Sequence, residues 1–246
     1  MDRSEEYLLH PGLLHDQCVT HSDPSNSTLF SCAPLYADDS LLVLDKPAGL
    51  LAVPGRGADK QDCLSARVQS HYPDALIVHR LDQATSGLML MARGVTVQRA
   101  LSRAFAAHAV SKRYLAVVAG EPIAPADSPD GWADIDLPIS LDWPNRPLRI
   151  IDPAHGKPSL TRWRVIGPEG DGETATTRLE LQPVTGRSHQ LRVHLRAIGH
   201  PILGDRLYAP AEVQALAGRL LLHAWRLHLT HPLTGARLCF ESPAPF

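Results

Sequence analysis

A polar loop from His79 to Gly87 gathers the side chains of this chain that could do chemistry. It holds one carboxylate, Asp82, together with an imidazole at His79, a guanidinium at Arg80 and a hydroxyl at Thr85. An ionised carboxylate can act as a nucleophile or stabilise an electron-poor sugar. The same residue types equally fit an aspartate that caps its own turn, with the hydroxyls bonded to backbone amides. Residue types alone leave both interpretations open.

Other kinds of chemistry find weaker support. His189 and His194 are five residues apart, whereas two zinc ligands that share one helix face are four apart, so we expect no metal site. The chain lacks the G-x-S-x-G sequence of a serine hydrolase. A glycosidase would need a second carboxylate near Asp82, which Asp134 or Asp136 could supply only if the fold brought one of them there.

Short strands on both sides are expected to hold the 79–87 loop in place. The sequence predicts strands at 41–44, 75–78, 88–91, 114–118, 174–182, 219–224 and 236–241, and helices at 63–72, 97–110 and 189–198. Ser188 is a candidate N-cap for the last helix, and Gly199 and Pro201 mark its end. Strands and helices alternate irregularly, which favours a mixed α+β sheet over a doubly wound fold.

Length and composition predict an ordinary globular chain. It has 246 residues, 44% of them hydrophobic and 20% charged, and its start lacks the basic-then-apolar order of a secretory signal. Four cysteines show no C-x-x-C spacing, so we expect free thiols and a cytoplasmic protein. Residues 1–36 show little periodicity and are expected to form an N-terminal arm.

The charge distribution is uneven although the formal net charge is only −2. Residues 79–114 carry six basic side chains and one acidic, residues 143–164 carry five and one, and residues 185–206 carry four and one. A fold could gather these three segments into one basic face for a polyanion, or leave them as separate solvated arginines.

Several sequence motifs, in a fixed order, carry a family resemblance. The loop His79-Arg80-Leu81-Asp82-Gln83-Ala84-Thr85-Ser86-Gly87 resembles the H-R-L-D-x-x-T-S-G signature of the RluA family of pseudouridine synthases. Four further segments are similar to motifs of that family, namely Asp45 to Leu51, Lys112 to Tyr114, Thr185 to Arg192 and Leu221 to Ala224. His200 to Asp205 follows the Thr185–Arg192 motif at the expected place.

The resemblance implies a fold and an activity. It implies a pseudouridine synthase fold: a mixed, mostly antiparallel central sheet flanked by helices, with a catalytic cleft, in a single catalytic domain over 37–246. The stretch Asp142-Trp143-Pro144-Asn145-Arg146-Pro147 looks like the dual-specificity RluA branch, which modifies position 32 of a tRNA anticodon loop and position 746 of 23S rRNA. It further implies a monomer acting on structured RNA, with no cofactor, no metal and no membrane partner. An S4 RNA-binding domain is not expected, because residues 1–36 are too few to pack one.

The resemblance also assigns roles to residues. Asp82 is the catalytic carboxylate and Arg187 its ion-pair partner, Arg80 fills the space left by the flipped base, and Tyr114 stacks on that base. His79, Thr85 and Lys112 support the active site. Charge alone adds possible phosphate contacts at Arg99, Arg103, Arg146, Arg149, Lys157 and Arg192.

Three other functions remain in view at this point. One is a pseudouridine synthase of a different RluA-family branch, with another tRNA or rRNA target. A second is a non-catalytic RNA-binding protein that keeps the fold, which has no reason to need Asp82, Tyr114 and Arg187 together. The third is the glycosidase, which would release a free base or sugar.

Overall fold

The computed structural model of this protein describes residues 19–20, 33–124, 128, 130–170 and 174–246. Most of the expected N-terminal arm therefore lies outside the described residues. The prediction of a single domain over 37–246 stays a prediction.

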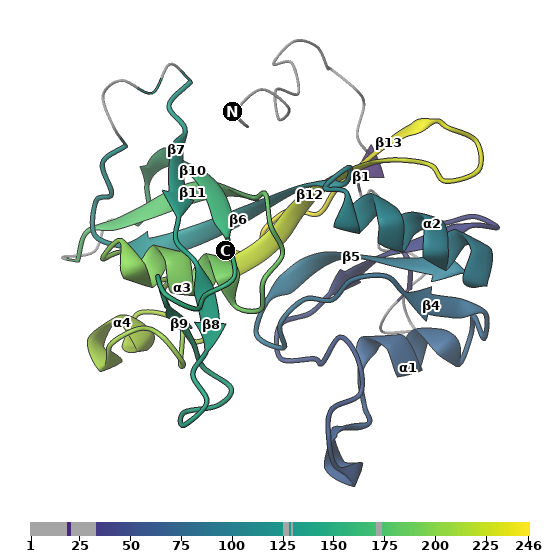
Figure 1. The fold of residues 1–246 in the computed structure, drawn as a ribbon, viewed down its shortest axis with the longest axis horizontal. Helices are drawn as coiled ribbons and strands as arrows, with labels where there is room; N and C mark the ends of the chain where they lie inside the picture. Colours follow the sequence, from purple (N-terminus) through teal and green to yellow (C-terminus); the bar gives the residue numbers. More distant parts are fainter. Residues whose placement is uncertain (1–18, 21–32, 125–127, 129, 171–173) are drawn as a thin grey trace.

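A long mixed sheet runs through the molecule (Figure 1). Its main path is β2-β3-β5-β12-β6-β11-β10-β7, with β4 beside β5, and with β13 pairing both β12 and β1. Among the described strands only β5–β12 and β1–β13 pair in parallel. A separate hairpin is formed by β8 and β9. The strands span Val19–Thr20 (β1), Tyr36–Ala37 (β2), Leu41–Lys46 (β3), Ala75–Ile77 (β4), Ser86–Arg93 (β5), Ser111–Ala119 (β6), Ala133–Asp136 (β7), Ile139–Leu141 (β8), Arg149–Ile151 (β9), Leu160–Pro168 (β10), Thr176–Pro183 (β11), Leu222–Thr230 (β12) and Arg237–Glu241 (β13).

Helices pack on both faces of this sheet. They span Leu64–Gln69 (α1), Val95–Ala106 (α2), Gln190–Ala197 (α3) and Ala211–Ala215 (α4), with a 3₁₀ turn at Ala58–Lys60 (η1). Alternate residues of a strand point to opposite faces. In β3, Leu42 and Leu44 pack with α1, whereas Leu41 and Val43 pack with α2. The core under α3 joins β6, β7, β10 and β11, and Tyr114 packs against both this core and the core under α1.

The predicted mixed α+β sheet is confirmed, and most element boundaries move by only a few residues. The helix expected at 97–110 runs from Val95 to Ala106, after Gly94 at its N-cap. The helix expected at 189–198 begins at Gln190, and its N-cap is His189 rather than Ser188. The sequence did not predict β1, β2, β7, β8, β9, β10 or α4. In β10 the alternation is broken by the bulge between Val165 and Gly167.

Two of the expected properties can be checked in the described part of the chain. Cys63 is a buried free thiol, but Cys239 is disulfide-bonded, so the expectation of thiols is wrong for Cys239. Within the described ranges, no helix is long and apolar enough to cross a membrane.

Gly87 allows the parallel contact between β5 and β12. Its φ of +108° lies where L side chains are rarely found, and it faces Ala224 across the pair. A Cβ at this position would lie 2.3 Å from the Ala224 carbonyl oxygen and 2.6 Å from the Ala224 nitrogen. Only glycine therefore lets these two backbones approach where the 79–87 loop enters the sheet.

Gly87→Ala is expected to destabilise the protein by about 3–5 kcal/mol, because overpacking against backbone adds to the strain of a positive φ. The matched control is Gly94→Ala, which has a positive φ of +78° but open space around its Cβ, so it carries backbone strain without a clash and should cost less, about 1–2 kcal/mol. Urea denaturation of both variants measures the difference. Equal losses for the two variants would contradict the close-approach argument.

Candidate active site

A cleft with two lobes opens around Asp82. The first lobe has a volume of about 720 Å³ and the second about 650 Å³. Five residues line both lobes: Arg80, Leu81, Asp82, His189 and Arg192. Asp82 therefore lies at the junction, with its side chain 23% exposed. Among the described residues that line the two lobes, it is the only carboxylate.

Lys46 joins the segment after β3 to the Asp82 loop. Its fully buried ammonium group donates to three backbone carbonyls, those of Pro47 and Leu50 at 2.8 Å and that of Gln83 at 3.1 Å. The Gly49 amide also donates to the Gln83 carbonyl, at 2.8 Å. Burial lowers the pKa of Lys46 to about 8, and the charge of Asp82 acts in the opposite direction. The Asp45–Leu51 motif thus fixes the position of the loop that carries Asp82.

Arg192 is the charged partner of Asp82. One of its terminal nitrogens lies 3.5 Å from Asp82 Oδ2, while its other two guanidinium nitrogens donate to both oxygens of Asp205, at 2.8 and 2.6 Å. Burial opposes the charge of Arg192, yet the hydrogen bonds to Asp205 and the nearby Asp82 raise its pKa above the usual value. The side chains of Arg192 and Asp205 are only 4% and 1% exposed. Asp205 therefore holds the Arg192 guanidinium in a fixed position beside Asp82.

The expected ion pair between Asp82 and Arg187 is wrong. Arg187 is exposed, and its guanidinium donates to the Pro158 carbonyl at 3.3 Å. It lies in the loop before α3, whereas Arg192 faces the cleft from within the helix. Arg187 does line the second lobe, together with Tyr114 and Asp82.

Gln190 anchors that loop. Its buried side-chain oxygen accepts from the Thr185 hydroxyl and the Arg187 amide, and its side-chain nitrogen donates to the Leu160 carbonyl and the Thr161 hydroxyl. A buried amide with all its bonds made fixes both its orientation and its neighbours. The Thr185–Arg192 motif is thus a loop tied to β10 followed by the helix that presents Arg192.

Tyr114 and Thr85 lie in the second lobe as the sequence reading expected. Burial raises the pKa of Tyr114, and the charge of Asp82 adds to the effect, so the phenol keeps its proton. The Thr85 amide donates to the Asp82 carbonyl at 3.1 Å and closes the turn after Asp82.

The neighbours of His79 fit a supporting role. Its Nε2 accepts from the Leu90 amide at 2.9 Å, and its ring stacks on Phe105 with centroids 4.5 Å apart. Burial and the charge of Lys112 lower the pKa of His79 to about 3. A neutral imidazole bonded to a backbone amide holds the start of the loop. Lys112 lines the same lobe, 5.9 Å from the centre of the Phe105 ring.

The candidate phosphate contacts divide into three groups. Exposed side chains are present at Arg99, Arg103, Arg146 and Lys157, and Arg149 is half-buried. Arg192 is buried and bound to two carboxylates, so its expected role as a surface phosphate contact is wrong. The three basic segments do not form one face either, because Arg113 points away from Tyr114 and stacks with Arg162 and Arg164 around Trp132.

Sequence reading missed several residues of the site. Lys46, Asp205 and Tyr208 had no assigned role, although Lys46 and Asp205 belong to motifs that the sequence reading had singled out. The sequence contains a feature that indicates Lys46 and Asp205: both are charged residues next to apolar runs, which favours their burial. A buried charge needs a partner. Which partner each of them takes depends on contacts between distant segments.

Comparisons with known proteins agree with this geometry. Residues 40–197 match the family described as RNA pseudouridylate synthase. The fold is similar to that of the solved structure named human RNA pseudouridylate synthase domain containing 1, with a TM-score of 0.69, 27% identity, and coverage of 87% of this chain and 84% of that one. The chain belongs to the RNA pseudouridylate synthase family, whose members isomerise uridine to pseudouridine in RNA.

Within the family, the similar relatives carry one name. The chain is 47% identical over 212 residues to the dual-specificity RNA pseudouridine synthase RluA of Escherichia coli (strain K12), covering 86% of this chain and 93% of that protein. It is 45% identical over 199 residues to the protein of the same name from Vibrio parahaemolyticus, covering 80% of this chain and 77% of that one.

Arg192→Met is expected to destabilise the protein by about 3–5 kcal/mol, because it leaves the Asp205 carboxylate buried without its cation. Arg187→Met is the matched control, since it removes an exposed guanidinium with one carbonyl contact, and should change stability by less than about 1 kcal/mol. Thermal and urea unfolding of both variants measure the two effects. A larger loss in Arg187→Met would contradict the assignment of Arg192 as the partner.

Proposed function

We propose that this protein converts uridines in RNA stem-loops to pseudouridine, acting on the tRNA anticodon loop and on a hairpin of 23S rRNA. The observation that carries the proposal is the single accessible carboxylate, Asp82, at the junction of a two-lobed cleft with a buried arginine behind it. The dual targets are those implied by the resemblance to the RluA branch, and the named relatives support them. The proposed place of action is the cytoplasm.

Asp82 carries the chemistry in this proposal. The reaction breaks the bond from uracil N1 to the ribose, turns the base, and joins the ribose to C5. The C5 proton is lost and N1 gains one, so the reaction involves no net oxidation or reduction and needs no redox cofactor. A carboxylate can add to the electron-poor sugar or to the ring, or stabilise the charge that develops. The fixed cation at Arg192 lies 3.5 Å from the Asp82 carboxylate and holds it in one orientation during these steps.

A target uridine reaches Asp82 only when it leaves the RNA stack, which costs a few kcal/mol. Arg80 is exposed and lines both lobes, so its planar guanidinium is available to fill the vacated space. Tyr114 supplies a neutral aromatic ring beside Asp82 on which the flipped base can stack. The lining of both lobes also opposes the glycosidase alternative, because that reaction needs a second carboxylate in the site.

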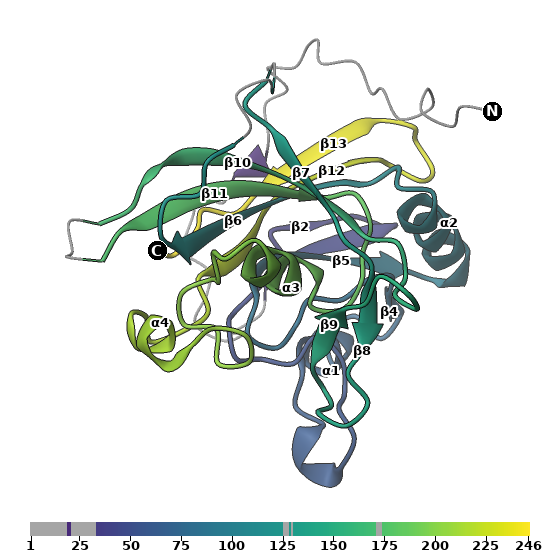
Figure 2. The same ribbon diagram turned by 60° about the vertical axis from the view of Figure 1, so that its left-hand side comes forward.

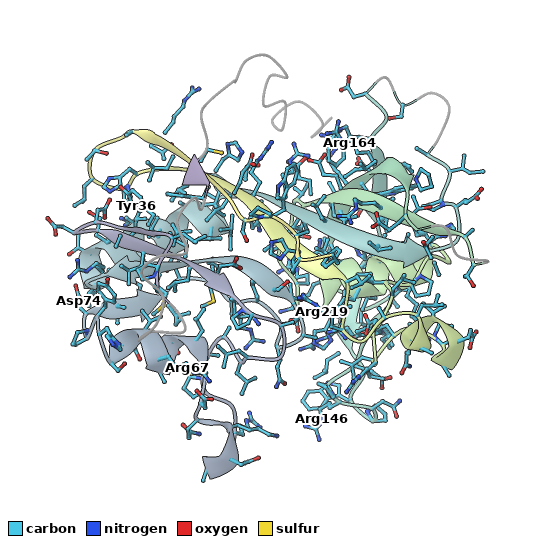
Figure 3. The ribbon with its side chains drawn as sticks, turned by 180° about the vertical axis from the view of Figure 1, so that it is seen from behind. Tyr36, Arg67, Asp74, Arg146, Arg164 and Arg219 are labelled. Carbon is cyan, nitrogen blue, oxygen red and sulfur yellow. The ribbon has the colours of Figure 1, made fainter. Side chains whose placement is uncertain are left out.

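The β8–β9 hairpin offers a surface for the RNA loop. Its tip projects from the same edge of the molecule as the η1 segment in both ribbon views (Figures 1 and 2), and Arg146 lies at that edge below Arg219 in Figure 3. Pro147 at this tip lines the first lobe. Trp143 is 66% exposed, and the Arg146 guanidinium lies 5.0 Å from the centre of its ring. An exposed aromatic ring with a cation favours stacking on an unpaired base.

Basic side chains behind the hairpin suit the phosphate backbone. Lys157 is exposed on the segment that follows β9, and Arg149 is half-buried within β9. An exposed cation is a favourable contact for a phosphate anion. Arg99 and Arg103 on α2 extend the proposed contacts toward the second lobe.

Asp82→Asn is expected to abolish tritium release from C5-tritiated uridine in tRNA, because the amide is neither a nucleophile nor an anion. RNA binding, measured by filter retention, should stay within a few fold of wild type. Asp39→Asn, at a fully exposed carboxylate, is the matched control and should keep full activity. Substantial tritium release by Asp82→Asn would overturn the proposed mechanism.

Trp143→Ala is expected to raise KM for the anticodon stem-loop about tenfold with little change in kcat, because stacking on one base contributes about 1–3 kcal/mol to binding. Leu233→Ala removes an equally exposed apolar side chain, 65% exposed, from the β12–β13 turn and serves as the control. Steady-state kinetics with a synthetic stem-loop measure both variants. An unchanged KM in Trp143→Ala would remove the hairpin from the RNA-binding surface.

A further inference from the structure

His189 lies directly beside Asp82 with an unusual backbone. It is the N-cap of α3, and its φ of 59° and ψ of 13° lie in the left-handed region that non-glycine residues rarely occupy. Its Nε2 lies 3.9 Å from Asp82 Oδ1, and its side chain lines both lobes of the cleft. Such conformations persist where surrounding contacts enforce them, as they often do at functional sites.

The hydrogen bonds of Tyr208 determine which ring nitrogen of His189 carries the proton. The Tyr208 oxygen accepts from the Arg149 amide at 3.0 Å and lies 2.5 Å from His189 Nδ1. Within the described part of the chain, Nδ1 is the one acceptor available to the Tyr208 hydroxyl proton, so the phenol donates to Nδ1. The neutral imidazole then carries its proton on Nε2.

The charged neighbours of His189 agree with this assignment. An ionised Asp82 can only accept hydrogen bonds, so a protonated Nε2 facing it is electrostatically more favourable than a lone pair would be. Burial lowers the pKa of His189, Arg192 and Arg149 act in the same direction, and Asp82 and Asp205 oppose them. Burial raises the pKa of Tyr208 to about 12, so the phenol keeps the proton that it donates.

The Nε2–H group is free to meet a substrate. A distance of 3.9 Å to Asp82 exceeds that of a hydrogen bond, and in the residues that the structure describes no other acceptor lies in reach of Nε2. Uracil carries two carbonyl oxygens, O2 and O4, placed symmetrically about the axis through N3 and C6. Turning the base about that axis exchanges N1 with C5 and O2 with O4, so a donor fixed at one place meets a carbonyl before and after the turn.

We propose that His189 is a specificity-determining residue that donates its Nε2–H to a carbonyl oxygen of the flipped uracil, next to Asp82. This inference rests on the proposed function. Cytosine carries an amino group in place of O4, and a donor facing a donor loses the hydrogen bond. The Tyr208–His189 pair would thus contribute to the choice of uracil, while Asp82 and Arg192 carry out the chemistry.

His189→Asn is the sharpest test of this role. Asparagine tolerates the left-handed backbone, and its side-chain oxygen can replace Nδ1 as the acceptor for Tyr208, but it does not extend to the position of Nε2. The expected result is a fall of about tenfold in kcat/KM on the stem-loop, with unfolding unchanged. His71→Asn, on an exposed histidine after α1, is the control and should match wild type.

Replacing an oxygen of the substrate by sulfur distinguishes a direct hydrogen bond from His189 to the base from a purely structural role of His189. Replacing the target uridine by 4-thiouridine or 2-thiouridine exchanges a carbonyl oxygen for sulfur, a weak acceptor, and should slow the wild-type protein about five- to tenfold in at least one case. The same substitution should slow His189→Asn by less than about twofold, because the donor is already absent. Conversion is followed by nucleoside chromatography, with the control variant alongside.

Each outcome bears on one of the two proposals. A sulfur penalty that persists in His189→Asn, or a wild-type protein that shows none, overturns this inference and leaves the proposed function standing. A wild-type protein that converts no uridine in any stem-loop overturns the proposed function. If His189→Asn does not fold, Tyr208→Phe is used in its place. This variant removes the hydroxyl that fixes the proton of His189 on Nε2, so it should also reduce the sulfur penalty.

Discussion

The site depends on keeping one arginine charged and motionless inside the protein. Arg192 is almost fully buried, which opposes its charge, and the bidentate hydrogen bonds to Asp205 compensate for the lost hydration. Because Asp205 takes two of its three nitrogens, only the third is left for Asp82, at the longer distance of 3.5 Å. Asp82 consequently lies next to a fixed positive charge but is not covered by it, and 23% of its side chain stays accessible.

A second buried cation holds the backbone around Asp82. Lys46 is a fully buried cation, and its three protons go to carbonyls of two separate segments, 47–50 and Gln83. Gly87, two residues after Thr85, brings the end of the loop within backbone contact of β12. The loop is therefore fixed before Asp82 by the His79 contact, after it by Lys46, and at its end by the sheet, so the carboxylate has a defined position before RNA binds.

The sequence predicted the strands of the sheet better than it predicted which charged side chains form pairs. Continuous apolar runs place β3, β5 and β6 within a few residues, because these strands have buried side chains on both faces of the sheet. Asp82 stands out because it is the one carboxylate in its loop. Choosing Arg187 over Arg192 failed because Arg187 lies in the loop before α3 and Arg192 lies within the helix. The helix begins at Gln190, which bonds to β10, a contact between residues about 30 apart in the chain.

Arg192 and His189 flank the Asp82 carboxylate, and each has a different role in the cleft. Arg192 approaches Oδ2 and His189 faces Oδ1, and Tyr208 lies behind both, with its ring 5.0 Å from the Arg192 guanidinium and its oxygen bonded to His189. One tyrosine thus contacts both the cation beside Asp82 and the imidazole that can face the base. A substrate whose base turns during the reaction needs such an arrangement, because groups that do not move can serve it both before and after the turn.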